Sequence, residues 1–143
     1  MARVKLSLPT NASIFKTQIP VRITDLNYGG HLGNQVFLEY CHEARAQYFK
    51  SLNQSETSFF DSALIMADAQ VVFRAEVFWE DTINFEVFVS EVGTYGFELF
   101  YLLTNSQNQE VARIKTGMVF FDYENRKIAK APSDLSQKLG VSN

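Results

Sequence analysis

The chain has 143 residues and a mass of 16.3 kDa, which allows one domain and excludes a second catalytic module. Hydrophobic residues make up 46% and charged residues 20%, so the chain can bury a core and is not of the disordered type. One cysteine and two histidines exclude a disulfide framework and a Cys-based zinc site, and a net charge of −3 argues against nucleic-acid binding.

The N-terminal segment shows no pattern typical of a targeting signal. Residues 1–14 are predicted to form a polar arm and lack the apolar stretch of a signal peptide. No run of about 18 apolar residues occurs, so no transmembrane helix is predicted. We therefore expect a cytoplasmic protein without membrane or nucleic-acid partners, in which residues 1–143 form a single domain.

The first half of the chain predicts a strand, a glycine-rich loop and a long helix. In residues 15–24 apolar and polar side chains alternate, which indicates a strand. Residues 25–34 read Asp-Leu-Asn-Tyr-Gly-Gly-His-Leu-Gly-Asn, and three glycines in ten residues predict a loop. Residues 35–52 predict the one long, central helix, with Asn34 as its N-cap and Cys41 on its apolar stripe.

The second half predicts successive antiparallel strands. Alternating apolar residues mark strands at 70–79, 82–92, 96–104, 110–122 and 127–131, and a short helix is expected after Pro132. This order predicts an α+β fold, a long, curled antiparallel sheet of meander type wrapped around one long central helix. Several strands carry apolar residues on both faces, so we expect a partner subunit to cover the second face.

The loop that leads into the helix carries the chemistry of the chain. Asp25, Asn27, His31 and Asn34 lie within ten residues of one another at a helix start. Free amides and a partial positive charge at such a start polarise a carbonyl group and stabilise an oxyanion. The loop therefore predicts attack on an ester or thioester, with His31 activating water and Asp25 or Glu43 orienting it.

The whole arrangement resembles a known family. A strand, the 25–34 loop, a long helix with His42-Glu43-Ala44-Arg45 and a long meander resemble the hotdog-fold acyl-CoA thioesterases of the 4-hydroxybenzoyl-CoA thioesterase type. The chain is also similar to plant acyl-carrier-protein thioesterases. The resemblance spans about Phe15 to Asp122 and implies metal-independent hydrolysis of an acyl-CoA or acyl-carrier-protein thioester to acid and thiol. It implies no cofactor beyond the coenzyme A of the substrate, and a homodimer or homotetramer.

Carried over residue by residue, the resemblance assigns roles within the loop and helix. The family's first Asp matches Asp25, its His matches His31, and an acid on the helix matches Glu43, which in an interface site would come from the partner. The family's second Asp, a catalytic carboxylate, falls on Asn27. This is a departure, because an amide is neither nucleophile nor base. The positions expected to bind the oxyanion or substrate are Gly30, Leu32, Gly33 and Asn34.

Other interpretations stay open. Asp25 and Asn27 also fit the role of turn residues without a catalytic function. Asn34 also fits a plain helix cap, and Glu43 fits a solvated position on the helix. The departure at Asn27 leaves room for a hotdog protein that binds an acyl ligand without efficient hydrolysis. A dehydratase on the same fold fits the loop less well, because it would pair a His with an acid or Cys facing the acyl β-carbon.

Overall fold

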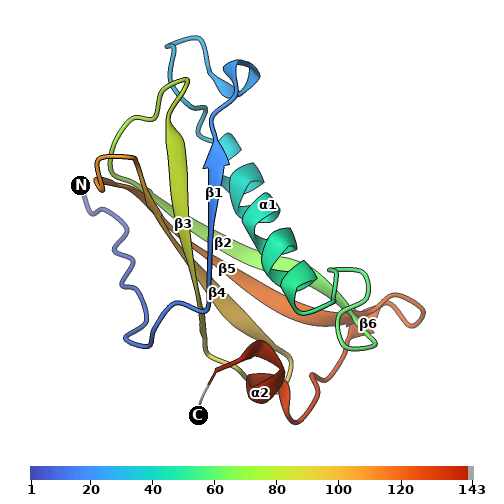
Figure 1. Ribbon diagram of the computed structural model, residues 1–143. Coiled ribbons are helices and arrows are strands. Elements are labelled where there is room, and N and C mark those ends of the chain that lie inside the picture. Colours follow the sequence, from blue (N-terminus) through green and yellow to red (C-terminus); the bar gives the residue numbers. More distant parts are fainter. Residues whose placement is uncertain (142–143) are drawn as a thin grey trace.

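The computed structural model describes residues 1–141, and its strands form one antiparallel sheet. The elements in chain order are β1 (Phe15–Pro20), a 3-10 turn η1 (Ile23–Asp25), α1 (Val36–Ser51), β2 (Ala63–Phe73), β3 (Thr82–Ser90), β4 (Gly96–Thr104), β5 (Glu110–Asp122), β6 (Lys127–Ile128) and α2 (Leu135–Leu139). The sheet curves around α1, which runs along its inner face (Figure 1). This confirms the predicted α+β architecture. Neither described helix combines the length and apolarity needed to cross a membrane.

The strand order is β1-β3-β4-β5-β2, with the short β6 beside β5. β3, β4 and β5 form the predicted meander. The expectation that all strands pair in succession is wrong for β2, which crosses to the far edge and pairs with β5, as in Val71 opposite Ile114. The long helix therefore connects two strands at opposite edges of the sheet, and its C-terminal half contacts β1 through Gln47, which bonds Thr17, and Tyr48, which packs on Phe15.

The predicted boundaries hold best in the middle of the sheet. β4 and β5 begin and end at the predicted residues, and each end of α1 lies within one residue of its prediction. The strand predicted at 70–79 instead spans Ala63–Phe73. Its residues 66–70 are exposed at a sheet edge and include a bulge between Met66 and Asp68, so they lack the apolar alternation of a covered strand. The first strand likewise ends at Pro20, before the predicted residue 24.

The main core lies between α1 and the inner face of the sheet. It contains Phe37, Cys41, Ala44, Tyr48 and Phe49 from the helix, and Ile83, Phe85, Val87, Leu99, Tyr101, Leu103, Ile114, Met118 and Phe120 from the central strands. Phe59, in the loop after α1, stacks among these aromatics, with its ring centroid 4.6 Å from that of Phe49 and 5.8 Å from that of Phe97. The aromatic-rich composition thus joins the helix, the loop and the sheet in one core.

One polar network crosses this apolar core. The buried Arg45 donates from Nε to Glu56 at 2.7 Å and from Nη1 to the Tyr101 hydroxyl at 3.2 Å. That hydroxyl lies 2.9 Å from Thr116 Oγ1. Burial raises the pKa of Tyr101 to about 12, so its hydroxyl stays protonated as a hydrogen-bonding group. The network ties the middle of α1 to β4 and β5. Breaking it would leave the charged guanidinium of Arg45 buried without a partner, which would destabilise the fold.

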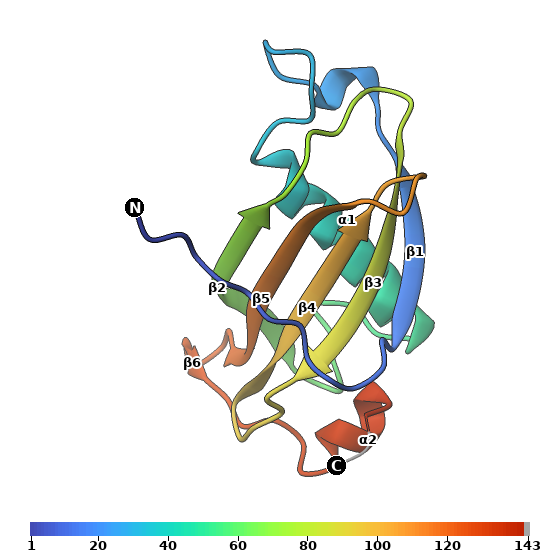
Figure 2. The same ribbon diagram turned by 90° about the vertical axis from the view of Figure 1, so that its left-hand side faces the viewer.

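The outer face of the sheet is covered in part by the chain itself. The N-terminal arm, residues 1–14, contains no helix or strand and crosses this face in front of the strands (Figure 2). Leu6 and Leu8 pack there against Val72, Phe88, Phe100 and Leu102. At these four positions the chain's own arm supplies cover that the sequence predicted from a partner subunit.

Candidate functional site

The glycine-rich segment folds into a hairpin-like turn that leads into α1. The Asn27 amide donates to the His31 carbonyl at 2.8 Å, and the Gly33 amide donates to the Asp25 carbonyl at 3.2 Å. At the tip, Gly30 has φ of 79°, a backbone conformation that favours glycine. These bonds hold the residues from Asp25 to Gly33 in a compact turn against the start of α1.

Asp25 anchors this turn to the helix. Its carboxylate accepts a 2.5 Å hydrogen bond from the buried Tyr40 hydroxyl and bonds at 3.1 and 3.2 Å from the Arg22 guanidinium. The Arg22 hydrogen bonds lower the pKa of Asp25, although burial opposes this. Burial and then Asp25 raise the pKa of Tyr40. A carboxylate committed to two donors is suited to positioning the turn, and a catalytic role for Asp25 stays a prediction.

Asn27 and His31 face the same point of the turn. A Cβ built on Gly29 would lie 3.2 Å from both Asn27 Oδ1 and His31 Nε2, so the glycine leaves room for these side chains. Asn27 Oδ1 accepts from the Gly29 amide at 2.8 Å, so the donor group left on the Asn27 side chain is Nδ2. His31 Nδ1 lies 3.4 Å from the Leu32 carbonyl, an arrangement that favours a proton on Nδ1 and leaves Nε2 as an acceptor.

The start of α1 differs from its prediction in two ways. The N-cap is Gln35, and no side chain caps the helix, so Asn34 does not have the expected capping role. The amides of Gly30, Leu32 and Gly33 donate to the carbonyls of Asn27, Val77 and Asp25, respectively, and are therefore not free to bind an oxyanion. Within residues 1–141, the amides of Asn34 and Gln35 have no hydrogen-bond acceptor. Of the four predicted oxyanion positions only Asn34 keeps a free amide, and the neighbouring Gln35 amide was not predicted.

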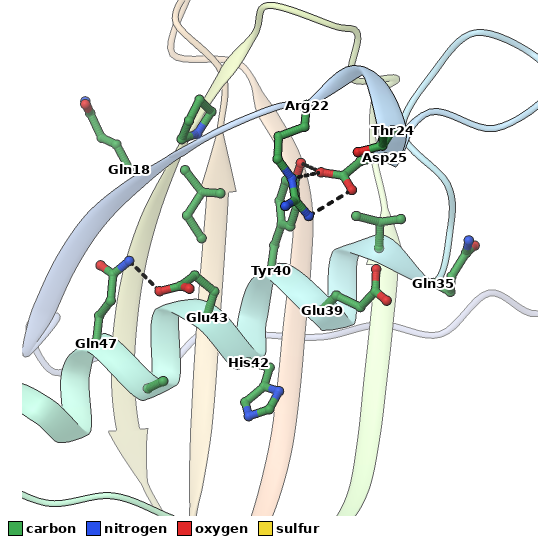
Figure 3. A pocket seen from close by; sticks show the side chains of 14 residues that line it. Gln18, Arg22, Thr24, Asp25, Gln35, Glu39, Tyr40, His42, Glu43 and Gln47 are labelled. Carbon is green, nitrogen blue, oxygen red and sulfur yellow. Dashed lines mark hydrogen bonds and ion pairs between the residues drawn. The ribbon is translucent and has the colours of Figure 1, made fainter.

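Glu43 lies in an open groove of about 900 Å³ between β1 and α1. Gln35, Glu39, Glu43 and Gln47, spaced four residues apart, line one side of it along the helix (Figure 3). Glu43 is exposed and accepts a 2.8 Å hydrogen bond from Gln47. The groove is therefore a polar channel whose end near the helix start holds the Asp25 carboxylate.

His31 and Asn34 line a second, smaller pocket of about 260 Å³. Its opposite wall is the segment after β2, where the Val77 carbonyl accepts from the Leu32 amide at 2.7 Å. Glu76 is the carboxylate of this pocket. The structure therefore separates the predicted site residues: Asp25 and Glu43 border the groove, His31 and Asn34 border the pocket, and the start of α1 lies between them.

Sequence reasoning missed Tyr40, Arg22 and Glu76. Tyr40 lies on the buried side of the helix, and the available signal was that a buried tyrosine hydroxyl usually needs a polar partner. Arg22 stands three residues before Asp25, close enough to pair within the turn. No feature of the sequence marked Glu76 as a site residue, because its segment was predicted to be a strand.

The remaining candidate groups lie outside this chemistry. Cys41 is fully buried, and burial raises the pKa of its thiol, which confirms its predicted place in the core. His42 is 65% exposed, lies 3.5 Å from Glu56 and also lines the groove next to Glu43 (Figure 3). The second histidine of the chain is therefore an exposed residue.

Together, the curved sheet around one helix and the turn at the helix start define a hotdog-fold protein of thioesterase type. The model of the thioesterase-like superfamily matches residues 21–139, and the chain belongs to that family. None of the curated proteins matches the chain significantly.

Several solved structures are similar to this chain over most of its length. A 1,4-dihydroxy-2-naphthoyl-CoA thioesterase from Synechocystis is 22% identical with a TM-score of 0.79, covering 88% of this chain and 95% of its own. A thioesterase from Thermus thermophilus, complexed with coenzyme A and Zn, is 20% identical with a TM-score of 0.77, covering 89% and 98%. A DHNA-CoA thioesterase from Staphylococcus aureus is 14% identical with a TM-score of 0.78, covering 87% of each chain. These structures share the fold of this chain.

Proposed function

We propose that this protein hydrolyses an acyl-CoA thioester at the start of α1. Membership of the thioesterase-like superfamily supports thioester hydrolysis in general. The observation that carries the proposal for this chain is the turn itself, where an acceptor nitrogen of His31 and the Asn27 side chain meet at Gly29 beside two free helix-start amides. The coenzyme A bound to one similar structure supports CoA as the carrier, and an acyl-carrier-protein thioester is the alternative carrier.

In the proposed reaction, His31 Nε2 takes a proton from a water molecule that Asn27 Nδ2 helps to position. The water oxygen bonds to the thioester carbon, and the carbonyl electron pair moves to its oxygen, where the Asn34 and Gln35 amides bind the oxyanion. The pair then returns and breaks the carbon–sulfur bond, and the proton on His31 passes to the leaving thiolate. Glu43 of a partner subunit would supply the carboxylate that orients His31 and the water, and no metal or further cofactor takes part.

We also propose a homodimer or homotetramer. β2 forms one edge of the sheet, and its residues 66–70 are exposed with unpaired backbone groups, a ready template for strand pairing with a second copy. In such an assembly, Glu43 of one subunit would complete the site at the turn of another. A stable monomer in light scattering would contradict this assembly. The cytoplasmic location stays a prediction from the sequence.

A panel of short, long and aromatic acyl-CoAs, assayed for thiol release with and without a chelator, tests the reaction. We expect release from at least one member at a rate that the chelator does not change. Tight binding without release across the panel would favour an acyl-ligand-binding protein, the alternative that Asn27 supports because it lacks a carboxylate. Double-bond formation or hydration without thiol release would indicate a dehydratase.

A further inference from the structure

The outer face of the sheet carries a second apolar cluster, separate from the core around α1. Val72, Phe88 and Phe100 point outward from β2, β3 and β4, and each is at most 9% exposed. A strand residue on an open sheet face would be far more exposed. The cover comes from the N-terminal arm, where Leu6 is 8% exposed and Leu8 packs beside it.

The arm is fastened by hydrogen bonds on both sides of this cluster. Arg113 on β5 donates from Nη1 to the Leu6 carbonyl at 3.1 Å. Farther along the arm, Asn11 donates from Nδ2 to the Val89 carbonyl at the end of β3, also at 3.1 Å. These bonds join the arm to strands more than 70 residues away in sequence, so it is part of the folded structure.

The arm presents one side to the sheet and the other to solvent. Leu6 is buried, whereas the flanking Lys5 and Ser7 are exposed and Val4 is 55% exposed. The arm crosses the strands and adds no strand to the sheet (Figure 2). Side-chain burial, more than backbone pairing, therefore holds it on this face.

We infer that the arm is an intramolecular strap, which occupies the outer apolar face of the sheet in place of a second copy of the chain. Without Leu6 and Leu8, the outward Phe88, Phe100 and Leu102 would form an uncovered apolar patch on the adjacent strands β3 and β4, with Val72 of β2 on the far side of Arg113 of β5. Such patches drive association between protein surfaces. With the strap closed, the β2 edge stays open to a partner and the outer face does not. The strap thus limits the size of the assembly, independently of thioesterase activity.

Leu6→Asp tests the strap, because a carboxylate is expelled from an apolar contact. Val4→Asp is the matched control on the same arm, at an exposed position. Val72→Cys is added to each of the two variants as a reporter, and its rate of maleimide labelling at high dilution measures how well the arm covers the face. The native Cys41 is buried and contributes little labelling of its own. Light scattering of Leu6→Asp and Val4→Asp without the reporter, at high concentration, measures the assembly. Leu6→Ala, read in the same way, replaces Leu6→Asp should the latter fail to fold by circular dichroism.

We expect Leu6→Asp to speed labelling of the reporter by about tenfold or more over Val4→Asp, since a buried leucine contact holds the arm closed. The mass of the Leu6→Asp assembly should be twice that of Val4→Asp, which keeps the wild-type mass. Equal labelling rates would show that the arm does not cover the face. Faster labelling with an unchanged mass would show that the strap does not limit assembly. Either result overturns the inference.

Discussion

At the residue scale, the pairing of Asp25 with Tyr40 joins the turn to the helix. A carboxyl predicted for catalysis is held by a buried hydroxyl and an exposed guanidinium. The same residue accepts from the Gly33 amide through its carbonyl, so its position determines where the turn meets α1. Asp25 therefore fixes the position of the turn that carries Asn27 and His31.

Tyr40→Phe removes the hydroxyl that donates to the Asp25 carboxylate. We expect the free energy of unfolding to fall by about 1–3 kcal/mol, the cost of losing a buried hydrogen bond to a charged group. Urea unfolding measures the difference. Tyr28→Phe is the matched control, because Tyr28 is fully exposed, and it should change nothing. Equal stability of Tyr40→Phe and wild type would show that this bond does not stabilise the fold.

The lowered pKa of Asp25 makes its contribution to stability depend on pH. Because Arg22 favours the ionised carboxylate in the folded state, the stabilisation is present above the ordinary aspartate pKa of roughly 4. It is lost as the pH falls through the lower pKa of the folded state. Asp25→Asn should therefore be less stable than wild type at pH 6, and the deficit should shrink by pH 3. A deficit that grows on acidification would contradict this, and Asp61→Asn, at an exposed loop position, serves as control.

At the element scale, the central strands were predictable because one face of each is fully buried. In β4 and β5 the alternating apolar residues all face α1, so pattern and structure coincide. β2 was not predictable, because an edge strand with a bulge loses that alternation. Residues 74–77 alternate like a strand, yet the Arg74 and Ala75 amides both donate to the Val111 carbonyl, and the chain then leaves the sheet.

The start of β4 depends on a glycine. A Cβ on Gly96 would lie 2.0 Å from the Met118 carbonyl oxygen, a backbone atom of β5 that cannot move without breaking the ladder. Gly96→Ala should lower the free energy of unfolding by about 1–3 kcal/mol or more, as overpacking does. Gly93→Ala, whose Cβ would have no neighbour closer than 3.9 Å, is the control for thermal unfolding. Two variants of equal stability would mean that the strands separate easily at this point.

The turn can be perturbed without touching the core. A Cβ on Gly29 would press on both Asn27 and His31 at 3.2 Å, so Gly29→Ala should displace the proposed water site. We expect a fall in kcat of roughly tenfold or more, because small displacements of catalytic groups are costly. Circular dichroism and thermal unfolding should stay near wild type. A wild-type kcat in Gly29→Ala would show that this turn takes no part in the reaction.

At the scale of the whole molecule, the fold and family followed from sequence, whereas the division of the site did not. Spacing along the chain placed Asp25, His31 and Asn34 together, but the turn directs Asp25 toward the groove and His31 toward the smaller pocket. The cover of the outer face was also not predictable, because a short polar arm carries only two leucines as a signal. Long-range packing of this kind does not show in local patterns.

The most direct measurement is thiol release from the preferred acyl-CoA by two histidine variants, with kcat/KM determined for each. His31→Gln removes the proposed base, and His42→Gln removes the other histidine of the chain, which contacts Glu56 on the surface. We expect His31→Gln to lower kcat/KM by about 10²–10⁴-fold, the usual contribution of a general base, while His42→Gln stays near wild type. Wild-type kcat/KM in His31→Gln would contradict hydrolysis at this turn.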